Sequence, residues 1–425
     1  MLAPLTGRNL QLFSSLNARG LICGLAKKLG FRLAHPPWAL FAEISLQDSD
    51  DRPARAGKRL LILGSYAPSL VNFRGPLIAA AVARGHRVFA AAPAIDAGTA
   101  EALRALGAEP LSINLARTSL NPFLAARTVS ELKALVRKLE PDVIFAYTIK
   151  PIVLGARAAG GVPRFVALVT GLGYAFTGGR HPRRLLSRLI AKALYRRAFA
   201  RASVAIFQNP DDREEFRRLG LLPAGLPTYL VAGSGVDLDL FRPAPLPDQP
   251  SFLMIARLLG DKGVREYADA AARLKRAHPG VRLMLAGWLD ESPDSIAQSE
   301  LDDAIACGVE YLGRLDDVRP AIATASVYVL PSYREGTPRS VLEAMAMGRA
   351  IITSDAPGCR QTVEKGVNGF LVPPRDADSL YRAMERLVLQ PELIAPMGAQ
   401  SQRMAVERFD ARRVAEELLE HAQLS

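Results

Sequence analysis

Apolar and polar positions alternate along this chain in short blocks. Beyond residue 57, apolar runs of strand length predict strands at 60–63, 87–91, 111–114, 143–146, 165–170 and 204–208. Stretches with helical periodicity separate them, for example 76–84, 100–106 and 128–139. Strands that alternate with helices in this way indicate a doubly wound parallel sheet, which binds ligands at the carboxyl ends of its strands.

A proline-rich break at 241–250 interrupts this pattern and is typical of a linker. After it the alternation resumes, with strands expected at 252–256, 282–286, 310–312, 327–330, 351–353 and 369–372. We therefore predict an α/β protein with two Rossmann-like domains, whose doubly wound parallel sheets face a central cleft. The predicted boundaries are 58–242 for the first domain, 243–250 for the linker, 251–408 for the second domain and 409–425 for a C-terminal helix.

Residues 1–57 form an N-terminal extension that we expect to be poorly ordered. This segment has five lysines and arginines before its first acid, Glu43, and it lacks the apolar core of a signal peptide. It is compatible with an amphipathic tether, a transit-like leader or an upstream extension of the reading frame. We favour the last, because residues 48–56 resemble a linker and a fresh domain begins after them.

The chain of 425 residues carries a formal net charge of +12, which points to an anionic partner: nucleic acid, an anionic membrane surface or a phosphorylated substrate. Its three cysteines and five histidines are scattered, so we expect neither a disulfide framework nor a metal site. No apolar run reaches the roughly 18 residues of a membrane span. The protein is expected in the cytoplasm.

The segment 331–348 carries two carboxylates in different settings. Glu335 lies on the loop after a predicted strand, before a helix that Thr337 is expected to cap and Pro338 to begin. Gly348 is expected to end this helix after about three turns.

Glu343 lies inside that helix among apolar residues, where a buried carboxylate needs a partner. A ligand diol is one candidate, because a carboxylate can accept two hydroxyl hydrogens. An ion pair with Arg339, four residues earlier, is the other, and the helix alone does not decide between them.

Arg257 and Lys262 flank the turn that follows the first strand of the second domain. Two cations beside a helix N-terminus suit a diphosphate. A solvated turn with two ordinary surface cations is the alternative, and taken alone the turn favours it.

These residues together resemble a known family. Arg257 and Lys262, the Glu335-Gly336-Thr337-Pro338…Glu343 spacing, Pro357-Gly358 and 366–372 are similar to the retaining GT-B glycosyltransferases of family 4. The resemblance spans roughly residues 58–420. It implies a GT-B architecture, with an acceptor-binding first domain and a nucleotide-sugar-binding second domain.

The resemblance also implies roles for single residues. Arg257 and Lys262 would hold the donor diphosphate and stabilise it as it leaves, and Glu343 would accept both ribose hydroxyls. Glu335 would contact the donor sugar near its reacting face, with backbone N–H groups of Gly336 and Thr337 nearby. Neither a cofactor nor a metal is expected.

The first domain resembles a subgroup that adds a sugar to a lipid-diphosphate-linked sugar in bacterial surface polysaccharide or glycan assembly. The segments 147–151, 171–177 and 233–237 carry this narrower match. Many family members place a histidine after the fourth strand; here Tyr147 or Lys150 would fill that space. Gly171 and Gly173 form either an acceptor-side loop or a plain loop.

The segment 180–201 holds eight lysines and arginines and no acid. Arg184, Arg188, Lys192 and Arg196 recur every four residues beside an apolar face, a pattern typical of a helix on an anionic membrane. The alternative is a solvated face of a helix packed on its own domain. We favour peripheral attachment at the inner face of the cytoplasmic membrane.

Three functions stay open at this point. The leading one transfers a hexose or N-acetylhexosamine from a nucleotide sugar, expected to be UDP-linked, to a polyprenyl-diphosphate-linked sugar. The second is a sugar-nucleotide epimerase on the same two-domain scaffold. The third is a non-enzymatic basic binder, but no nucleic-acid motif accompanies the basic helix, so nucleic acid is not expected as a partner.

Overall fold

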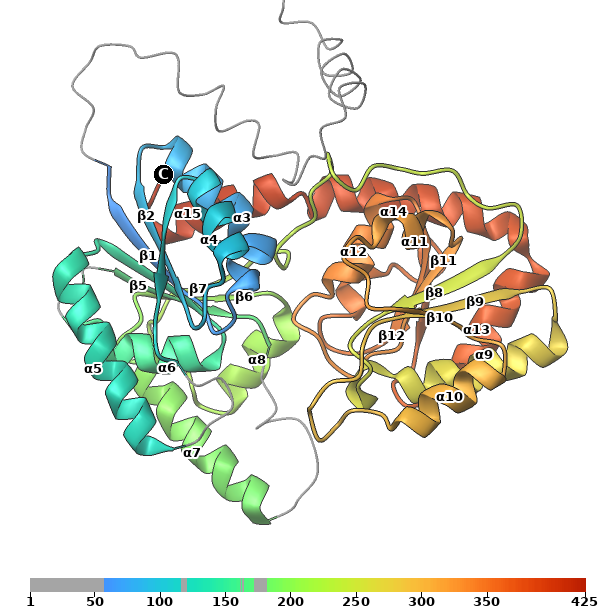
Figure 1. Ribbon diagram of the computed structural model, residues 1–425, viewed down its shortest axis with the longest axis horizontal. Helices are drawn as coiled ribbons and strands as arrows, with labels where there is room; N and C mark the ends of the chain where they lie inside the picture. The colour runs from blue at the N-terminus through green and yellow to red at the C-terminus, as the bar shows by residue number, and fades with distance from the viewer. Residues whose placement is uncertain (1–56, 116–120, 161, 163, 172–181) are drawn as a thin grey trace, which may run out of the picture. The chain divides into compact units, whose positions relative to one another are not determined.

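The computed structural model describes residues 57–115, 121–160, 162, 164–171 and 182–425 (Figure 1). The extension predicted for 1–57 therefore lies outside the described residues except for Gly57, and so does Gly173. The side chains of Arg184 and Arg188 lie outside the description as well.

The first half contains a seven-stranded parallel sheet in the order β3-β2-β1-β4-β5-β6-β7. Its strands are β1 (Arg59–Leu63), β2 (Arg87–Ala92), β3 (Ala108–Ser112), β4 (Val143–Tyr147), β5 (Arg164–Val169), β6 (Val204–Phe207) and β7 (Thr228–Leu230). Its helices are α3 (Pro68–Ala83), α4 (Ala97–Ala105), α5 (Pro122–Leu139), α6 (Ile149–Ala158), α7 (Pro182–Phe199) and α8 (Pro210–Arg218). The strand order reverses between β1 and β4, where Leu60 pairs with Val143.

The second half contains a six-stranded parallel sheet in the order β10-β9-β8-β11-β12-β13. Its strands are β8 (Ser251–Ile255), β9 (Arg282–Ala286), β10 (Glu310–Gly313), β11 (Val327–Leu330), β12 (Ala350–Ser354) and β13 (Gly369–Val372). Its helices are η2 (Gly260–Lys262), α9 (Val264–Ala277), α10 (Gln298–Ala306), α11 (Arg319–Ala323), α12 (Arg339–Ala346), η3 (Arg360–Thr362), α13 (Ala377–Leu389), η4 (Pro391–Leu393), α14 (Ile394–Arg408) and α15 (Ala411–Ala422). The prediction of two doubly wound parallel sheets is confirmed.

Element boundaries differ in the first half. The helix predicted from residue 76 begins at Pro68, and Pro76 lies inside it. Proline favours the first turn of a helix, so the periodicity was assigned to the wrong proline. Strand β3 lies slightly earlier than predicted, and the three-residue strand β7 was missed because it is short and half-exposed.

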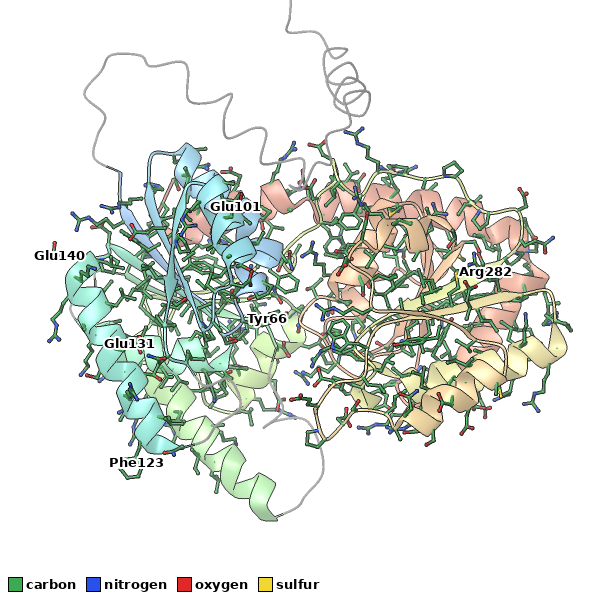
Figure 2. The ribbon with its side chains drawn as sticks, in the orientation of Figure 1. Tyr66, Glu101, Phe123, Glu131, Glu140 and Arg282 are labelled. Carbon is green, nitrogen blue, oxygen red and sulfur yellow. The ribbon has the colours of Figure 1, made fainter. Side chains whose placement is uncertain are left out.

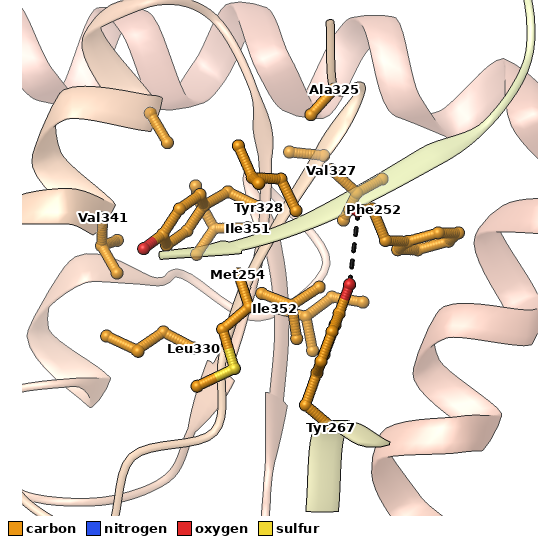
Figure 3. Close-up of a cluster of buried hydrophobic side chains, with 14 of the residues drawn as sticks. Phe252, Met254, Tyr267, Ala325, Val327, Tyr328, Leu330, Val341, Ile351 and Ile352 are labelled. Carbon is orange, nitrogen blue, oxygen red and sulfur yellow. Dashed lines mark hydrogen bonds between the residues drawn. The ribbon is translucent and has the colours of Figure 1, made fainter. Parts of the chain in front are cut away.

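Apolar side chains fill the space between each sheet and its helices. In the second half, the buried Tyr267 hydroxyl donates to the carbonyl oxygen of Phe252 at 3.3 Å (Figure 3). It also lies 2.8 Å from the carbonyl oxygen of Met284. Both acceptors belong to strands, so this tyrosine ties α9 to the sheet. Charged side chains such as Glu140 and Arg282 lie on the surface (Figure 2).

The linker and the C-terminal helix are both held by specific contacts. Arg349 is fully buried and donates to the linker carbonyls of Ala244 and Pro245. Helix α15 packs against α3 of the first half, where Arg84 pairs with Glu416. The chain therefore returns to its first half at its end. No helix within the described residues is long and apolar enough to cross a membrane.

Candidate active site

The loop from β11 to α12 carries the central sequence motif. Helix α12 has eight residues and begins at Arg339 with Pro338 as its N-cap, so it is shorter than predicted, and the prediction that Thr337 caps it is wrong. The Thr337 hydroxyl instead donates to the Gln208 carbonyl of the first half at 3.1 Å. Gly348 follows the helix with φ 80°, as expected of the residue that ends it.

Glu343 points into the packed side of α12 and is 7% exposed. Its Oε1 lies 2.8 Å from Nε of Arg339, so the ion pair considered from the sequence is present. Burial raises the pKa of Glu343, and the charge of Arg339 opposes that rise. One pairing does not exhaust a carboxylate, which has several acceptor positions, so the ribose role is compatible with this geometry.

Arg339 also contacts the first half. Its Nη1 donates to the carbonyl oxygen of Asn72, and its guanidinium carbon lies 5.2 Å from the ring centroid of Phe73. Both residues belong to α3, so the arginine that pairs with Glu343 also joins α12 to α3.

Lys262 and Glu335 form a half-buried ion pair, with Nζ 2.7 Å from Oε1. They meet because the turn containing η2 packs on the end of β11: a Cβ on Gly263 would lie 2.2 Å from the Pro331 carbonyl oxygen. Burial alone would lower the pKa of Lys262, but the negative charges of Glu335 and Asp261 outweigh it and raise this pKa. Lys262 is therefore a firmly charged cation beside the predicted sugar-contacting carboxylate.

Arg257 lies on the same side of the second sheet. Its Nη1 donates to Oδ2 of Asp290 at 3.0 Å, and its side chain is 38% exposed. Its positive charge acts on the pKa values of both Lys262 and Asp261. The structure thus places Arg257, Lys262 and Glu335 in one electrostatic cluster.

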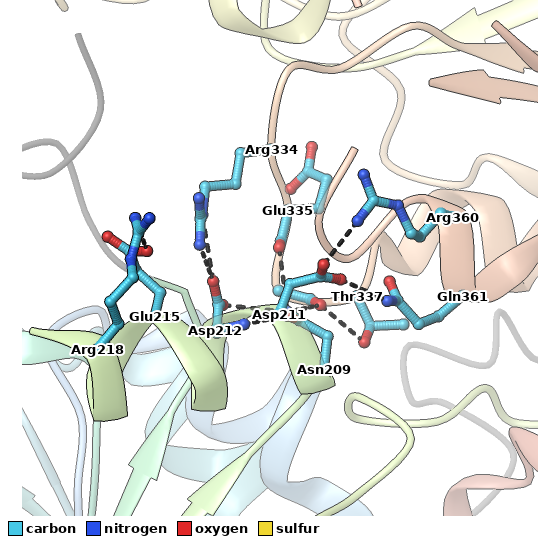
Figure 4. Close-up of polar contacts among 11 residues, drawn as sticks. Asn209, Asp211, Asp212, Glu215, Arg218, Arg334, Glu335, Thr337, Arg360 and Gln361 are labelled. Carbon is cyan, nitrogen blue, oxygen red and sulfur yellow. Dashed lines mark hydrogen bonds and ion pairs between the residues drawn. The ribbon is translucent and has the colours of Figure 1, made fainter. Parts of the chain in front are cut away.

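The N-terminus of α8 holds the loop that contains Glu335 and Gly336 (Figure 4). Asn209 donates from Nδ2 to the Gly336 carbonyl oxygen at 2.7 Å. Asp212, fully buried, pairs with Arg334, and Asp211 accepts from Arg360 Nη1 at 2.6 Å.

Sequence reasoning missed these contacts of α8. In the sequence, helix α8 is marked by Asn-Pro-Asp-Asp after a predicted strand, a pattern typical of a capped helix start. The partners of these residues lie more than a hundred positions away.

The predicted acceptor-side residues differ in their setting. Tyr147 is 2% exposed, and its hydroxyl lies 2.7 Å from the Ser69 hydroxyl. Lys150 is on the first turn of α6, where burial lowers its pKa. Gly171 has φ 135° and lies beside Gly336, where a Cβ would approach the Gly336 nitrogen to 3.9 Å.

Helix α7 has a buried side and an exposed side. Tyr195 and Phe199 are buried, and their ring centroids lie 5.1 Å and 5.6 Å from that of Phe216 in α8, so the helix packs on its own half. Leu189 and Ile190 are 56% and 53% exposed. Lys192 is partly exposed and Arg196 exposed.

Two family models match this chain. The model described as "Glycosyl transferase 4-like domain" matches residues 74–230, and "Glycosyl transferases group 1" matches residues 249–390. The first match lies in the half that contains the seven-stranded sheet, and the second lies in the half that contains the six-stranded sheet. The chain is a family 4 glycosyltransferase. The family predicted from its motifs is confirmed.

The glycosyltransferase has relatives along nearly its whole length. It is 29% identical, over 85% of this chain and 97% of the relative, to N,N'-diacetylbacillosaminyl-diphospho-undecaprenol alpha-1,3-N-acetylgalactosaminyltransferase of Campylobacter jejuni. Alpha-D-kanosaminyltransferase of Streptomyces kanamyceticus is 28% identical over 56% of this chain and 66% of the relative. Both are named as transferases of sugars.

Solved structures share the GT-B fold of the glycosyltransferase. Sucrose-phosphate synthase from Thermosynechococcus elongatus superposes with a TM-score of 0.71 at 20% identity, covering 86% of this chain and 98% of that chain. Anabaena Alr3699/HepE, solved in complexes with UDP and with UDP-glucose, gives 0.68 at 21% identity, covering 86% and 99%. These likenesses confirm the predicted architecture.

Proposed function

We propose that this glycosyltransferase moves a hexose or N-acetylhexosamine from a UDP-sugar to a polyprenyl-diphosphate-linked sugar, with retention at the anomeric carbon. The observation that carries the proposal is the cluster of Lys262, Glu335 and Arg257, with Lys262 Nζ 2.7 Å from Glu335. The undecaprenol-diphosphate acceptor in the name of the Campylobacter relative supports the acceptor class. The UDP complexes of the Anabaena protein support the donor class.

In the proposed reaction the bond between the anomeric carbon and the diphosphate oxygen breaks, and a bond to an acceptor hydroxyl oxygen forms on the same face. The acceptor's proton passes to the departing phosphate, so UDP leaves without a separate base. Negative charge grows on the diphosphate as this bond breaks. Lys262 and Arg257, fixed by their acidic partners, stabilise that charge electrostatically.

Lys262 exchanges partners in this mechanism. Before the donor binds, it neutralises Glu335; once the diphosphate arrives, the cation is shared and Glu335 can accept from a sugar hydroxyl. Glu343 accepts from the ribose hydroxyls, and the positive charge of Arg339 favours its ionised form against the effect of burial, which raises its pKa. The backbone N–H groups of Gly336 and Thr337 lie on a loop that Asn209 anchors through the Gly336 carbonyl.

Release of UDP tests this function. The full chain is incubated with a panel of UDP- and GDP-sugars, with and without a polyprenyl-diphosphate-linked sugar. UDP release that depends on the acceptor, with an α- or β-linked product matching the donor's configuration, is the expected result. An isomerised donor without acceptor would instead indicate the epimerase, which the transferase names of the relatives do not favour.

We also propose that α7 attaches the enzyme to an anionic membrane surface, where a lipid-linked acceptor resides. Leu189 and Ile190 are more than half exposed beside the partly exposed Lys192. Phe123, at the start of α5, is 82% exposed (Figure 2). Each surface-proximal cation contributes about 1 kcal/mol at an anionic leaflet.

Sedimentation with vesicles of anionic phospholipid tests the attachment. Leu189→Glu combined with Lys192→Glu is expected to abolish binding. Leu389→Glu, at a 65% exposed position of α13 in the second half, is the matched control and should bind as the wild type does. Undiminished binding by the α7 variant would contradict the attachment.

A further inference from the structure

Arg74 of α3 is a buried cation without an anionic partner. The side chain is 2% exposed, and its Nε and Nη1 have no hydrogen-bond acceptor among the residues that the structure describes. Its guanidinium carbon lies over the face of the Tyr147 ring, 4.9 Å from the ring centroid. Burial lowers the pKa of Arg74 to about 10, so the side chain is still charged at neutral pH.

Arg349 is a second buried arginine, and its hydrogen bonds differ from those of Arg74. It is 0% exposed, and although its Nε has no hydrogen-bond acceptor among the described residues, its two terminal nitrogens donate to the carbonyl oxygens of Ala244, Pro245 and Ala325. Buried cations are ordinarily paired or hydrogen-bonded in this way, because desolvation penalises an unpaired charge. Arg74 departs from that rule, so its charge serves something other than packing.

Arg74 lies near the carboxyl end of strand β4. Its side chain leans toward the N-terminus of α3, as helical side chains do, and so toward the carboxyl edge of the sheet. Tyr147, which it covers, is the last residue of β4. The edge between β1 and β4 is where the strand order reverses, and open α/β sheets bind ligands at such a point.

Neighbouring groups on this edge are polar and constrained. Thr148 has φ 66°, a conformation that is strained for a β-branched residue, and its hydroxyl lies 2.9 Å from that of Ser65. Lys150 follows on the first turn of α6. Asn72 and Phe73, directly before Arg74, contact Arg339 of the donor-side helix α12. Cations and hydroxyls are therefore gathered next to the proposed donor site but on the acceptor half.

We propose that Arg74 binds a phosphate of the acceptor, the diphosphate that joins its lipid to its sugar. The inference rests on the proposed function. A guanidinium presents paired N–H donors that match phosphate oxygens in a bidentate way, and it does so best where water is excluded. Arg74 is thus the acceptor half's counterpart of Arg257 and Lys262.

Binding of two soluble diphosphates tests the assignment. Wild type and Arg74→Met are titrated with farnesyl diphosphate, an isoprenoid diphosphate, and with UDP. Because a buried charged hydrogen bond is lost, affinity for farnesyl diphosphate should fall about 30-fold or more. UDP affinity should stay unchanged. The melting temperature should not fall, since methionine removes an unpaired buried charge.

Arg349→Met is the matched control. This variant leaves the carbonyl oxygens that Arg349 binds without a donor, so its melting temperature should fall. Its affinities for farnesyl diphosphate and for UDP should stay unchanged. Arg74→Lys, which keeps the charge without the paired donors, should recover part of the farnesyl diphosphate affinity.

Three outcomes would overturn the assignment. They are farnesyl diphosphate affinity that is equal in wild type and Arg74→Met, no farnesyl diphosphate binding by the wild type, and loss of UDP affinity alone. Loss of UDP affinity alone would indicate that Arg74 binds the donor phosphates instead. If binding depends on Arg74 but no lipid-linked sugar ever stimulates UDP release, the proposed function fails while the anion site stands.

Discussion

Cations at the carboxyl edges of the two sheets have different kinds of partner. On the second sheet each predicted ligand-binding cation has an acidic partner: Lys262 has Glu335 and Arg257 has Asp290. On the first sheet Arg74 is more deeply buried than either and has an aromatic ring in place of an acid. Paired cations are held in position and exchange partners when an anion arrives, whereas an unpaired one gains its first anion from the ligand.

This difference has an energetic consequence. Breaking a pair by truncating one member leaves a buried charge uncompensated, so such variants should lose stability as well as activity. Removing the unpaired cation should cost binding alone.

Lys262→Met should give the largest loss of activity. In the proposed reaction it removes a charge that would face the leaving diphosphate, and it leaves Glu335 without its cation. Loss of one such electrostatic group lowers kcat by about 100- to 1,000-fold. Steady-state rates of acceptor-dependent UDP release measure it, and Lys365→Met, at an exposed lysine, is the control. Activity within a factor of a few of wild type would remove Lys262 from the mechanism.

Asp212→Ala should give the largest loss of stability. Asp212 is fully buried and pairs with Arg334, so truncation leaves a cation unpaired at the contact between the halves. Breaking a buried pair costs about 3–5 kcal/mol. Urea unfolding measures it, with Asp211→Ala, whose carboxylate is partly exposed, expected to lose less. Equal stability of Asp212→Ala and wild type would contradict the pairing.

Glu343→Gln should weaken nucleotide binding while keeping the shape of the side chain. A neutral amide accepts ribose hydroxyls less strongly than a carboxylate, and the loss of a charged hydrogen bond costs about 1.5–3 kcal/mol. Calorimetric titration with UDP measures it. A uridine nucleotide lacking both ribose hydroxyls should bind wild type and Glu343→Gln with equal affinity. A difference between the two affinities would place Glu343 away from the ribose.

The same residue predicts a pH dependence. Burial raises the pKa of Glu343 above its ordinary value of 4.5, so its carboxylate takes up a proton earlier as the pH falls. UDP affinity should therefore begin to decline at a pH above the ordinary glutamate range, and a bound ribose should be lost as the group is neutralised. Titrations across acidic pH should show this decline in wild type and not in Glu343→Gln.

Asp290→Asn should give the smallest effect. Its partner Arg257 is more than a third exposed, and exposed ion pairs contribute about 0.2–1 kcal/mol. Freed from the aspartate's charge, Arg257 should hold UDP slightly tighter. Salt dependence of UDP binding checks it, since the gain should vanish at high ionic strength. A large loss of UDP affinity in Asp290→Asn would contradict the small contribution expected of this exposed pair.

Sequence alone was sufficient for the sheets and the donor motif because both are local signals. Alternating apolar runs predicted twelve of the strands, and the spacing from Glu335 to Glu343 placed one carboxylate on a loop and one in a helix. It could not give the pairing of Lys262 with Glu335, because these residues are 73 positions apart in the sequence and only the fold brings them together. The capping role of Thr337 was wrong for a related reason: its hydroxyl is used by Gln208 of the other half.

Arg74 escaped prediction for a different reason. In the sequence it is one of many arginines, and nothing local marks it as buried or unpaired. Only the packing of α3 against the end of β4 removes it from water and places it over Tyr147. The tyrosine was predicted as an acceptor-side residue, whereas the structure buries it beneath the arginine.

An experimental structure with an intact UDP-sugar tests the central claim most directly. The account predicts Lys262 Nζ and the Arg257 guanidinium within hydrogen-bonding distance of the diphosphate, and a Glu343 carboxylate oxygen in contact with the ribose hydroxyls. A nucleotide bound with its ribose away from α12, or with Lys262 still paired only to Glu335, would contradict it.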